Sequence, residues 1–274
     1  MKKCVIVGSN SYLAQNLENY FPDMIVYKLN HRNWLQNVEL LKSADYVINF
    51  CINPNNFDED VDPNSVIDVH IARELLHSNA LFFFLSSRKV YGRSSRLLTY
   101  YEESELKPFD FYSRNKLRVG TVLKDILGPR LSILRISNIL GNPEIKEGYN
   151  TFMGWITKNF LEHGRLVINQ SKFTVRDFIT KRYFHYVLSS LVRNNVVGVH
   201  NISSNINIPL GTLLGCIVGN ENVIEQESNI TDQFLLSNEK IYCYLDQVLT
   251  KDVLIRELLD YRNEMFSLRA KYQK

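Results

Sequence analysis

The sequence has little of what marks secreted, metal-binding or disulfide-bonded proteins. Its 274 residues include only four cysteines, which lie far apart and form no Cys-x-x-Cys pair. Neither a disulfide framework nor a zinc site is expected, and we interpret the cysteines as reduced thiols of a cytoplasmic protein. The six histidines have no metal-ligand spacing either, so no metal is predicted.

Long apolar runs and a strong charge of one sign are also absent. No segment has the roughly 20 consecutive apolar residues that a membrane-spanning helix needs. The net charge is +3, and the lysine and arginine residues form no dense cluster. Binding to nucleic acid or to a membrane surface is therefore not expected.

Over its first two thirds the sequence alternates short apolar runs with helical patterns. The runs predict strands at residues 4–7, 24–29, 46–51, 81–86 and 131–136. The patterns between them predict helices at residues 13–20, 66–76 and 114–127. Apolar strands that alternate with helices are typical of a parallel sheet covered on both faces. We therefore predict an α/β fold, a Rossmann-type doubly wound parallel sheet.

The regular alternation ends near Gly141, and a smaller lobe is predicted beyond it. The remaining patterns predict helices at residues 152–163, 184–192, 210–219 and 253–271, and strands at 166–168 and 199–202. We assign residues 1–143 and about 177–204 to a dinucleotide-binding lobe. In this interpretation a small C-terminal substrate lobe consists of residues about 144–176 and 205–274.

The turn after the first predicted strand has the position at which dinucleotide-binding folds hold a pyrophosphate. It reads Gly8-Ser9-Asn10-Ser11-Tyr12-Leu13-Ala14. Gly8 permits a tight turn, Ala14 is small enough for a helix to approach the sheet, and Ser11 replaces the second usual glycine. The turn alone is a weak signal, because an ordinary strand–helix connection can have the same composition.

The end of the second predicted strand indicates which cofactor is preferred. A carboxylate there binds the ribose hydroxyls of NAD, whereas a cation accepts the phosphate of NADP. The segment is Lys28-Leu29-Asn30-His31-Arg32 and contains no acid. NADP(H) is therefore favoured over NAD(H), with Arg32 or Lys28 as the phosphate contact. The alternative is that these side chains are solvated surface charges.

Two further segments carry candidate catalytic side chains. Ser87 lies in Ser-Ser-Arg-Lys-Val-Tyr-Gly at 86–92, at the end of a predicted strand, where a side chain points into the ligand crevice. Tyr112 and Lys116 open a predicted helix, and their spacing of four places them on one face. A nearby ammonium lowers the pKa of a phenol toward the range that proton transfer needs. Spacing alone is not specific, because 15 tyrosines and 16 lysines give about one such pair by chance.

Together these segments resemble the extended short-chain dehydrogenase/reductases, the NAD-dependent epimerase/dehydratase family, whose members modify nucleotide-linked sugars. Two more segments are similar to family stretches: Leu-Arg-Ile-Ser-Asn-Ile-Leu-Gly at 134–141 and Arg-Asp-Phe-Ile at 176–179. The matches run in family order from residue 1 to about residue 205.

The resemblance implies a role for each matching residue. Tyr112 would exchange a proton with the reacting sugar oxygen, Ser87 would hydrogen-bond that oxygen, and Lys116 would bind the nicotinamide ribose. The implied cofactor contacts are Gly8, Asn10, Ser11, Tyr12, Leu13, Asn30, His31, Arg32, Cys51, Tyr112 and Lys116. The implied contacts to a nucleotide-diphospho sugar are Ser87, Lys89, Asn138 and Arg176, the last two at its diphosphate. A guanidinium suits phosphate oxygens, with a surface ion pair as the alternative for Arg176.

Departures from the family pattern reduce the set of reactions expected for this chain. The family's dehydratases place an Asp-Glu pair after the catalytic serine or threonine, but Arg88 and Lys89 stand there, so elimination of water lacks its acid and base. Asp68 stands where asparagine is usual, and no acid is found at 180–183 where one is usual. These departures bear on cofactor affinity and on the substrate lobe.

The preference for NADP and the short chain favour net reduction. The predicted reaction is reduction of a nucleotide-diphospho-4-keto-6-deoxy sugar at C4, with hydride from nicotinamide and the proton from Tyr112. Small family members of this kind make deoxy sugars for bacterial surface polysaccharides. The alternatives are an NAD-dependent nucleotide-sugar epimerase and a non-catalytic, cofactor-binding member of the family. The resemblance also implies a homodimer formed through the helices at 66–76 and 114–127.

Overall fold

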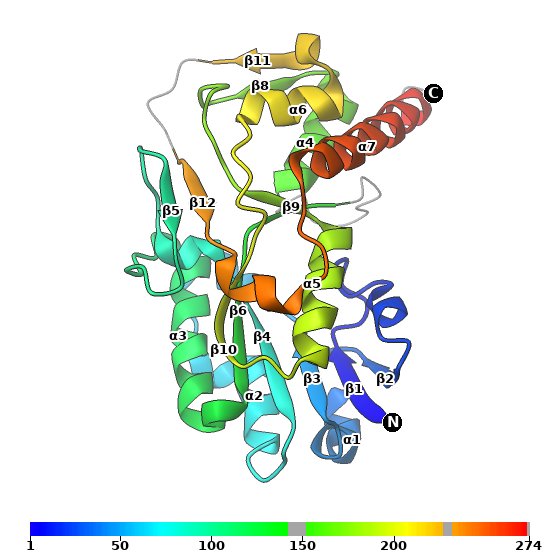
Figure 1. Ribbon diagram of the computed structural model, residues 1–274, viewed down its shortest axis with the longest axis vertical. Helices are drawn as coiled ribbons and strands as arrows, with labels where there is room; N and C mark the ends of the chain where they lie inside the picture. Colours follow the sequence, from blue (N-terminus) through cyan, green and yellow to red (C-terminus); the bar gives the residue numbers. More distant parts are fainter. Residues whose placement is uncertain (142–151, 227–231, 273–274) are drawn as a thin grey trace.

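The computed structural model describes residues 1–141, 152–226 and 232–272, and a six-stranded parallel sheet lies at its centre (Figure 1). In the order β10-β6-β4-β3-β1-β2, every neighbouring pair is parallel. The strands are β1 (Lys2–Val7), β2 (Met24–Leu29), β3 (Tyr46–Asn49), β4 (Leu81–Ser87), β6 (Leu131–Ile136) and β10 (Gly198–Ile202). The predicted Rossmann-type sheet is confirmed. Its strand order reverses beside β1, and open α/β sheets bind ligands at such a point.

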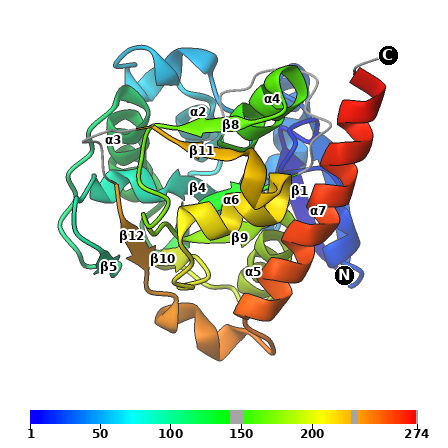
Figure 2. The same ribbon diagram turned by 90° about the horizontal axis from the view of Figure 1, so that it is seen from above.

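The sheet is buried on both faces because successive residues of each strand pack on opposite sides. Cys4 and Ile6 of β1 belong to the core that includes α5 (Lys181–Arg193). Val5 and Val7 belong to the core under α2 (Ile67–Glu74) and α3 (Phe111–Leu127). Figure 2, which looks down on the molecule, shows α2 and α3 on one side of the sheet and α5 on the other. This two-sided burial explains why the strands are apolar throughout.

The prediction of a helix at residues 13–20 is wrong. Turns occupy residues 12–16, followed by a four-residue 3-10 helix at Leu17–Tyr20. Asn16 has φ of 67°, a left-handed conformation that asparagine tolerates and an α-helix does not contain. The carbonyl of Leu13 accepts a hydrogen bond from Nε2 of His185 at 2.8 Å, whereas in an α-helix it would accept a backbone N–H. A tertiary contact from α5 therefore replaces the local helical pattern.

Helix α3 begins three residues before its predicted start because Asp110 caps it. The Asp110 carboxylate accepts the N–H of Ser113 at 2.8 Å, and the Ser113 hydroxyl accepts the N–H of Asp110 at 3.1 Å. This reciprocal pair is a capping box, which satisfies amides that the first turn of a helix leaves free. Tyr112 consequently lies in the first turn of α3.

Smaller elements cover the carboxyl edge of the sheet (Figure 1). The predicted helices are present as α4 (Phe152–His163), α6 (Leu210–Val218) and α7 (Lys251–Tyr272), and a short α1 (Val38–Lys42) was not predicted. Three two-stranded parallel pairs are β5 (Leu98–Tyr100) with β12 (Phe234–Leu236), β7 (Asn138–Leu140) with β9 (Phe178–Thr180), and β8 (Leu166–Ile168) with β11 (Val223–Glu225). Of these six strands only β8 was predicted. Three-residue strands carry too short a pattern to show in sequence, and each depends on a distant partner.

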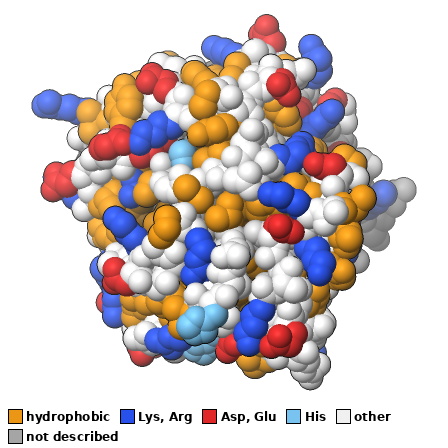
Figure 3. Space-filling model, turned by 60° about the horizontal axis from the view of Figure 1, so that its bottom comes forward, with side chains coloured by type: hydrophobic (Ala, Val, Ile, Leu, Met, Phe, Trp, Pro, Cys, Tyr) orange, Lys and Arg blue, Asp and Glu red, His pale blue; other side chains and the backbone are white. Residues whose placement is uncertain are grey.

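The outer surface mixes charges of both signs. Figure 3 shows basic and acidic side chains interspersed among apolar ones on the lower side of the molecule. Among the residues that the structure describes, no helix is long and apolar enough to span a membrane.

Candidate active site

The carboxyl edge of the sheet brings together side chains that lie far apart in sequence. Gly8 follows β1, Asn30 follows β2, Cys51 lies just beyond β3, and Ser87 ends β4. Because these strands are parallel and adjacent, their ends meet beside the point where the strand order reverses. A ligand crevice is expected there.

Gly8 packs against the end of β3 so closely that no side chain fits. Its φ is +79°, and a Cβ atom would lie 2.7 Å from the backbone nitrogen of Cys51 and 2.9 Å from its sulfur. Both the conformation and the approach require glycine. Burial raises the pKa of the Cys51 thiol to about 11, so this thiol is neutral at pH 7 and unsuited to nucleophilic chemistry.

The turn at residues 8–14, called here the glycine turn, lacks the α-helix that usually follows such a turn in dinucleotide-binding folds. The N–H of Ser11 bonds to the carbonyl of Gly8 at 2.9 Å, which closes the turn at the end of β1. The Tyr12 ring lies 4.2 Å from the Lys181 ammonium and against Gly141. Because a 3-10 helix stands in place of an α-helix after the turn, the aligned N–H groups and dipole of a helix N-terminus are missing.

The end of β2 offers one unpaired cation to a cofactor phosphate. Lys28 forms an ion pair with Glu18, so it is not free for that role. The Asn30 carboxamide accepts the N–H groups of Arg32 at 2.8 Å and Asn33 at 3.1 Å, which shapes the turn. Arg32 and His31 are exposed, and no carboxylate contacts either among the described residues. Of the two predicted phosphate contacts, Lys28 is thus paired with a carboxylate and Arg32 is not.

Ser87, Tyr112 and Lys116 lie together beside β4 and α3. The Ser87 hydroxyl lowers the pKa of the Tyr112 phenol. The Lys116 ammonium is 6.0 Å from the centre of the Tyr112 ring. That ring stacks on Phe57, with centroids 4.8 Å apart and planes 2° from parallel. We refer to Ser87, Tyr112 and Lys116 as the candidate trio. The sequence analysis missed Phe57, because nothing in its sequence context indicates a stacking role.

The Tyr112 phenol keeps its proton in this setting. Burial raises its pKa to about 12, the charges of Asp110 and Asp68 add to that effect, and the Ser87 hydroxyl opposes it. The group is therefore protonated at neutral pH. The prediction that Lys116 lowers this pKa is wrong, because burial and the two carboxylate charges raise it. Lys116 is buried as well, and burial lowers the pKa of its ammonium, while the charge of Asp68 opposes this.

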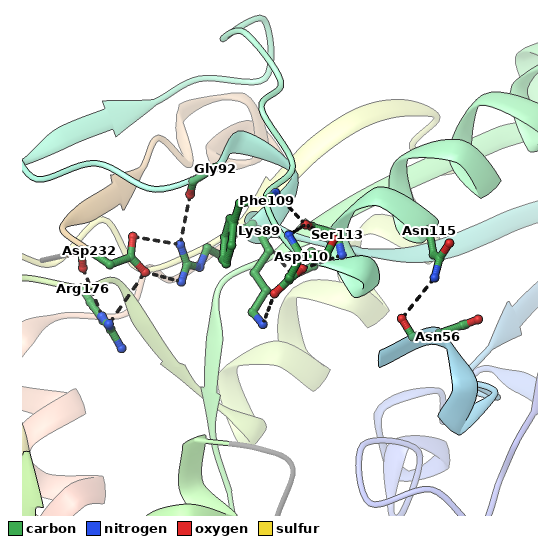
Figure 4. Close-up of polar contacts among 11 residues, drawn as sticks. Asn56, Lys89, Gly92, Phe109, Asp110, Ser113, Asn115, Arg176 and Asp232 are labelled. Atoms are coloured by element: carbon green, nitrogen blue, oxygen red, sulfur yellow. Dashed lines mark hydrogen bonds and ion pairs between the residues drawn. The ribbon is translucent and has the colours of Figure 1, made fainter. Parts of the chain in front are cut away.

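The two cations after Ser87 are both held by carboxylates (Figure 4). Arg88 donates to both carboxylate oxygens of Asp232, at 2.8 and 3.4 Å, and its guanidinium lies 3.9 Å from the centre of the Phe234 ring. Its side chain is 7% exposed, so it is a buried structural cation. Lys89 donates to Asp110 at 2.8 Å and lies 5.6 Å from the centre of the Tyr112 ring. The Lys89 side chain thus lies beside Tyr112, whereas the Arg88 side chain is turned toward Asp232.

Arg176 and Asn138 are engaged by neighbouring parts of the chain. Arg176 donates to the carbonyl of Asp232 at 3.1 Å and to the Gln170 side chain at 2.8 Å, and its guanidinium lies 3.7 Å from the Asp232 carboxylate. Asn138 donates to the carbonyl of Asp177 at 3.1 Å. Their role at a diphosphate stays a prediction. Sequence reasoning missed Asp232, which joins Arg88 to Arg176 from more than 50 residues away.

Among the described residues, no cluster of three or more histidine, cysteine, aspartate or glutamate side chains could hold a metal ion.

Comparisons with known proteins agree with this geometry. Residues 4–202 match the model of the NAD dependent epimerase/dehydratase family. No curated protein matches the chain in sequence.

Three solved structures are similar over nearly the whole chain. The UDP-N-acetylglucosamine 4-epimerase from Methanobrevibacter ruminantium M1, in complex with UDP-N-acetylmuramic acid, is 16% identical with a TM-score of 0.79, covering 97% of this chain and 99% of its own. The dTDP-glucose 4,6-dehydratase from Bacillus anthracis str. Ames, in complex with NAD, is 15% identical with a TM-score of 0.75, covering 99% and 100%. The dTDP-4-dehydrorhamnose reductase from Yersinia enterocolitica is 15% identical with a TM-score of 0.72, covering 97% and 100%. At these identities the three structures show a shared fold. With the family match extending over most of its length, the chain belongs to the NAD-dependent epimerase/dehydratase family.

Proposed function

We propose that this protein reduces a nucleotide-diphospho-4-keto-6-deoxy sugar at C4, with NADPH preferred over NADH. The observation that carries the proposal is the arrangement of the candidate trio: Tyr112 keeps its phenol proton at neutral pH, Ser87 acts on that phenol, and the Lys116 ammonium lies 6.0 Å from the centre of the Tyr112 ring. A protonated phenol suits donation to a keto oxygen, which is the proton step of a reduction. The product would serve the synthesis of deoxy sugars for surface polysaccharides.

The chain's own residues would act as follows. Gly8 and the backbone of the glycine turn would hold the cofactor's pyrophosphate, Arg32 the phosphate of NADP, and Lys116 the nicotinamide ribose. When bound, the nicotinamide supplies the hydride. Ser87 donates a hydrogen bond to the keto oxygen, which polarises the carbonyl, and Tyr112 passes its proton to the same oxygen. Lys116 then stabilises the phenolate that remains.

Elimination of water is disfavoured by the two residues after Ser87. An acid and a base are needed there, and the chain has cations instead. Arg88 is locked against Asp232 at 2.8 Å and turned into the protein, and Lys89 is paired with Asp110 at 2.8 Å. Neither is placed or charged to remove a proton from a sugar carbon.

Epimerisation is the second candidate, and one observation favours it. The ion pair between Lys28 and Glu18 removes one of the two cations that supported a preference for NADP. An enzyme that holds NAD would return the hydride to the other face of the same carbon and produce no net reduction.

The non-catalytic alternative gains support from the missing helix after the glycine turn, but it does not explain why the candidate trio is assembled.

The division into lobes and the oligomeric state also belong to this proposal. Residues 1–143 and 177–204 would hold the cofactor and the remainder the sugar nucleotide; the boundary at 143 lies outside the described residues. A homodimer would form through α2 and α3, whose outer faces carry charged side chains.

The test is nicotinamide absorbance while the purified protein meets NADPH, then NADH, with a panel of nucleotide-diphospho-4-keto-6-deoxyhexoses. Stoichiometric loss of NADPH is the expected result, with turnover lost in Tyr112→Phe and kept in the matched control Tyr101→Phe, an exposed tyrosine. If the reduced cofactor persists while an epimerised sugar and tightly bound NAD are found, the protein is an epimerase. If neither occurs, the reductase proposal is wrong.

A further inference from the structure

A third polar side chain shares the face of α3 that carries Tyr112 and Lys116. Asn115 follows Tyr112 by three positions and precedes Lys116 by one, and residues three and four apart lie on the same side of a helix. Its residue is 1% exposed, so its amide must find partners inside the protein. The proposed reaction does not use this side chain.

Asn115 binds the connection between β3 and α2 to α3. Its amide nitrogen donates to the carbonyls of Asn56 at 3.1 Å and Glu59 at 2.7 Å, and Figure 4 shows the first of these bonds. Its amide oxygen accepts the N–H of Val61 at 3.1 Å. Both donors and the acceptor of one buried amide are therefore used on the backbone of a single short segment, residues 56–61.

Phe57 lies in this segment and contacts Tyr112. It is the last residue of a 3-10 helix at Pro54–Phe57 and directly follows Asn56, whose carbonyl Asn115 binds. Its ring stacks on the Tyr112 ring, with centroids 4.8 Å apart and planes 2° from parallel. Phe57 is 37% exposed, so burial alone does not fix its ring, and the backbone next to it is held by Asn115.

The plane of the Tyr112 ring matters for proton transfer, because a phenol O–H prefers to lie in the plane of its ring. The torsion that turns a tyrosine ring is soft, so the neighbours of the ring set this plane. The ammonium groups of Lys89 and Lys116 lie 5.6 and 6.0 Å from the ring centre, near the outer limit of a cation–π attraction. The parallel stack on Phe57 is the contact best suited to fix the ring.

We propose that Asn115 is a positioning residue: it holds residues 56–61 against α3 and so keeps the Phe57 ring stacked on the Tyr112 ring, in the orientation from which Tyr112 donates its proton. This rests on the proposed function, since the ring plane of Tyr112 matters here as that of the proton donor. Asn115 and Phe57 contact neither the substrate nor the transferred proton in this account, and both act through the Tyr112 ring.

The test is NMR of the free protein with carbon-13-labelled tyrosine, in which the Tyr112 ring signals are assigned from a Tyr112→Phe sample. A stacked ring shifts the signals of its neighbour through its ring current, and Phe57→Leu gives the position of the unstacked signals. Asn115→Leu keeps the size of the side chain and removes its three hydrogen bonds. The expected result is that Asn115→Leu moves the Tyr112 signals toward their position in Phe57→Leu.

The matched control is Arg114→Ala, which breaks an exposed ion pair of 3.1 Å between the same helix and Asp60 of the same segment. Exposed pairs contribute little, so the Tyr112 signals should stay in place. Unmoved Tyr112 signals in a folded Asn115→Leu protein, or an equal movement in Arg114→Ala, would overturn the proposal.

Hydrogen exchange of the unaltered protein keeps the proposal testable if Asn115→Leu folds poorly. The N–H of Val61 is bonded to the buried Asn115 side chain and should exchange slowly. The N–H of Asn64 is bonded to the exposed side chain of Asp62 and should exchange much faster. Equal rates at Val61 and Asn64 would show that Asn115 does not hold the segment.

Activity separates this proposal from the function on which it rests. If the protein is a reductase, Phe57→Leu and Asn115→Leu should each lower kcat about tenfold with little change in KM, because the donor is misaligned while binding is kept. The double variant should lose no more than the larger single loss, since both changes act through one contact. Phe57→Tyr keeps an aromatic ring for the stack and should keep kcat, as should Phe111→Leu, a control with the similar exposure of 38%.

The outcomes distinguish the two proposals. Moved Tyr112 signals in an Asn115→Leu protein whose parent reduces no sugar would support the role of Asn115 in holding the ring and refute the reaction. Moved signals with unchanged kcat in an active reductase would refute the positioning role and leave the reaction standing. A higher KM with unchanged kcat in Phe57→Leu would make Phe57 a binding contact and also overturn the proposal.

Discussion

The two halves of the candidate site lie at the ends of β1 and β4, with β3 between them in the sheet, and they differ in how much of a cofactor-dependent site they retain. At the end of β4 and the start of α3, Lys116 is buried, Ser87 and Tyr112 are partly buried, and a capped helix holds Tyr112 and Lys116. At the end of β1, Gly8 keeps its strained turn, but turns and a 3-10 helix replace the helix that should come next. The half at β4 and α3 keeps all three residues of the candidate trio, whereas the half at β1 keeps the glycine turn without an α-helix after it. The comparison predicts a protein with intact proton transfer and weakened cofactor binding.

The largest expected effect tests the half at β4 and α3. Tyr112→Phe removes the donated proton and leaves the ring to stack on Phe57, so kcat should fall about a thousandfold. The dissociation constant of NADPH, measured by fluorescence, should change little. A variant that keeps most of its turnover would show that Tyr112 is not the proton donor.

The buried ion pair behind Ser87 gives the next effect. Arg88→Met removes the cation and leaves Asp232 buried at 6% exposure beside Arg176. Losing one partner of a buried pair should lower the free energy of unfolding by about 3 kcal/mol. Denaturant unfolding measures this, with Lys42→Ala, which breaks an exposed pair, as a control that should not change stability. An Arg88→Met protein as stable as the parent would contradict the structural role given to this arginine.

A substitution at Gly8 tests the half of the candidate site at the end of β1. Gly8→Ala would place a methyl group 2.7 Å from the Cys51 nitrogen in a left-handed conformation, so a loss of about 3 kcal/mol in stability and much weaker NADPH binding are expected. Gly128→Ala is the matched control, since Gly128 also has positive φ but its Cβ would meet nothing within 4 Å. Equal losses at both positions would mean that backbone conformation, and not the contact with β3, requires Gly8.

The smallest effect concerns cofactor preference. Arg32→Ala should weaken NADPH about tenfold and NADH hardly at all, because the lost charge-assisted contact is to the phosphate. Lys28→Ala should affect both cofactors little, since Lys28 is paired with Glu18. Isothermal titration calorimetry gives the four dissociation constants, one for each variant with each cofactor. Equal weakening of NADPH and NADH in Arg32→Ala would remove the case for NADP.

The same contrast separates what the sequence could predict from what it could not. The sheet was predictable because strands such as Leu81–Ser87 are apolar on both faces, and burial on both faces is what a parallel sheet requires. The candidate trio was predictable because Ser87 ends a strand and Tyr112 and Lys116 share a helix face.

Features that depend on distant partners could not be read locally. The helix at 13–20 fails because His185 takes the Leu13 carbonyl. Asp232 binds Arg88 across 144 positions of the chain, and no short-range pattern connects them. Strands β5 and β12 are likewise three residues each and pair with each other from distant parts of the sequence.

The central claim is net hydride transfer to C4 of a sugar, with Tyr112 giving the proton. It is tested most directly with NADPH that carries deuterium at the transferable position and a nucleotide-diphospho-4-keto-6-deoxyhexose, with the sugar then examined by mass spectrometry and NMR. The expected result is a 4-hydroxy product with one deuterium on C4, formed in step with loss of NADPH and absent with Tyr112→Phe. A sugar that changes configuration without gaining deuterium would contradict it.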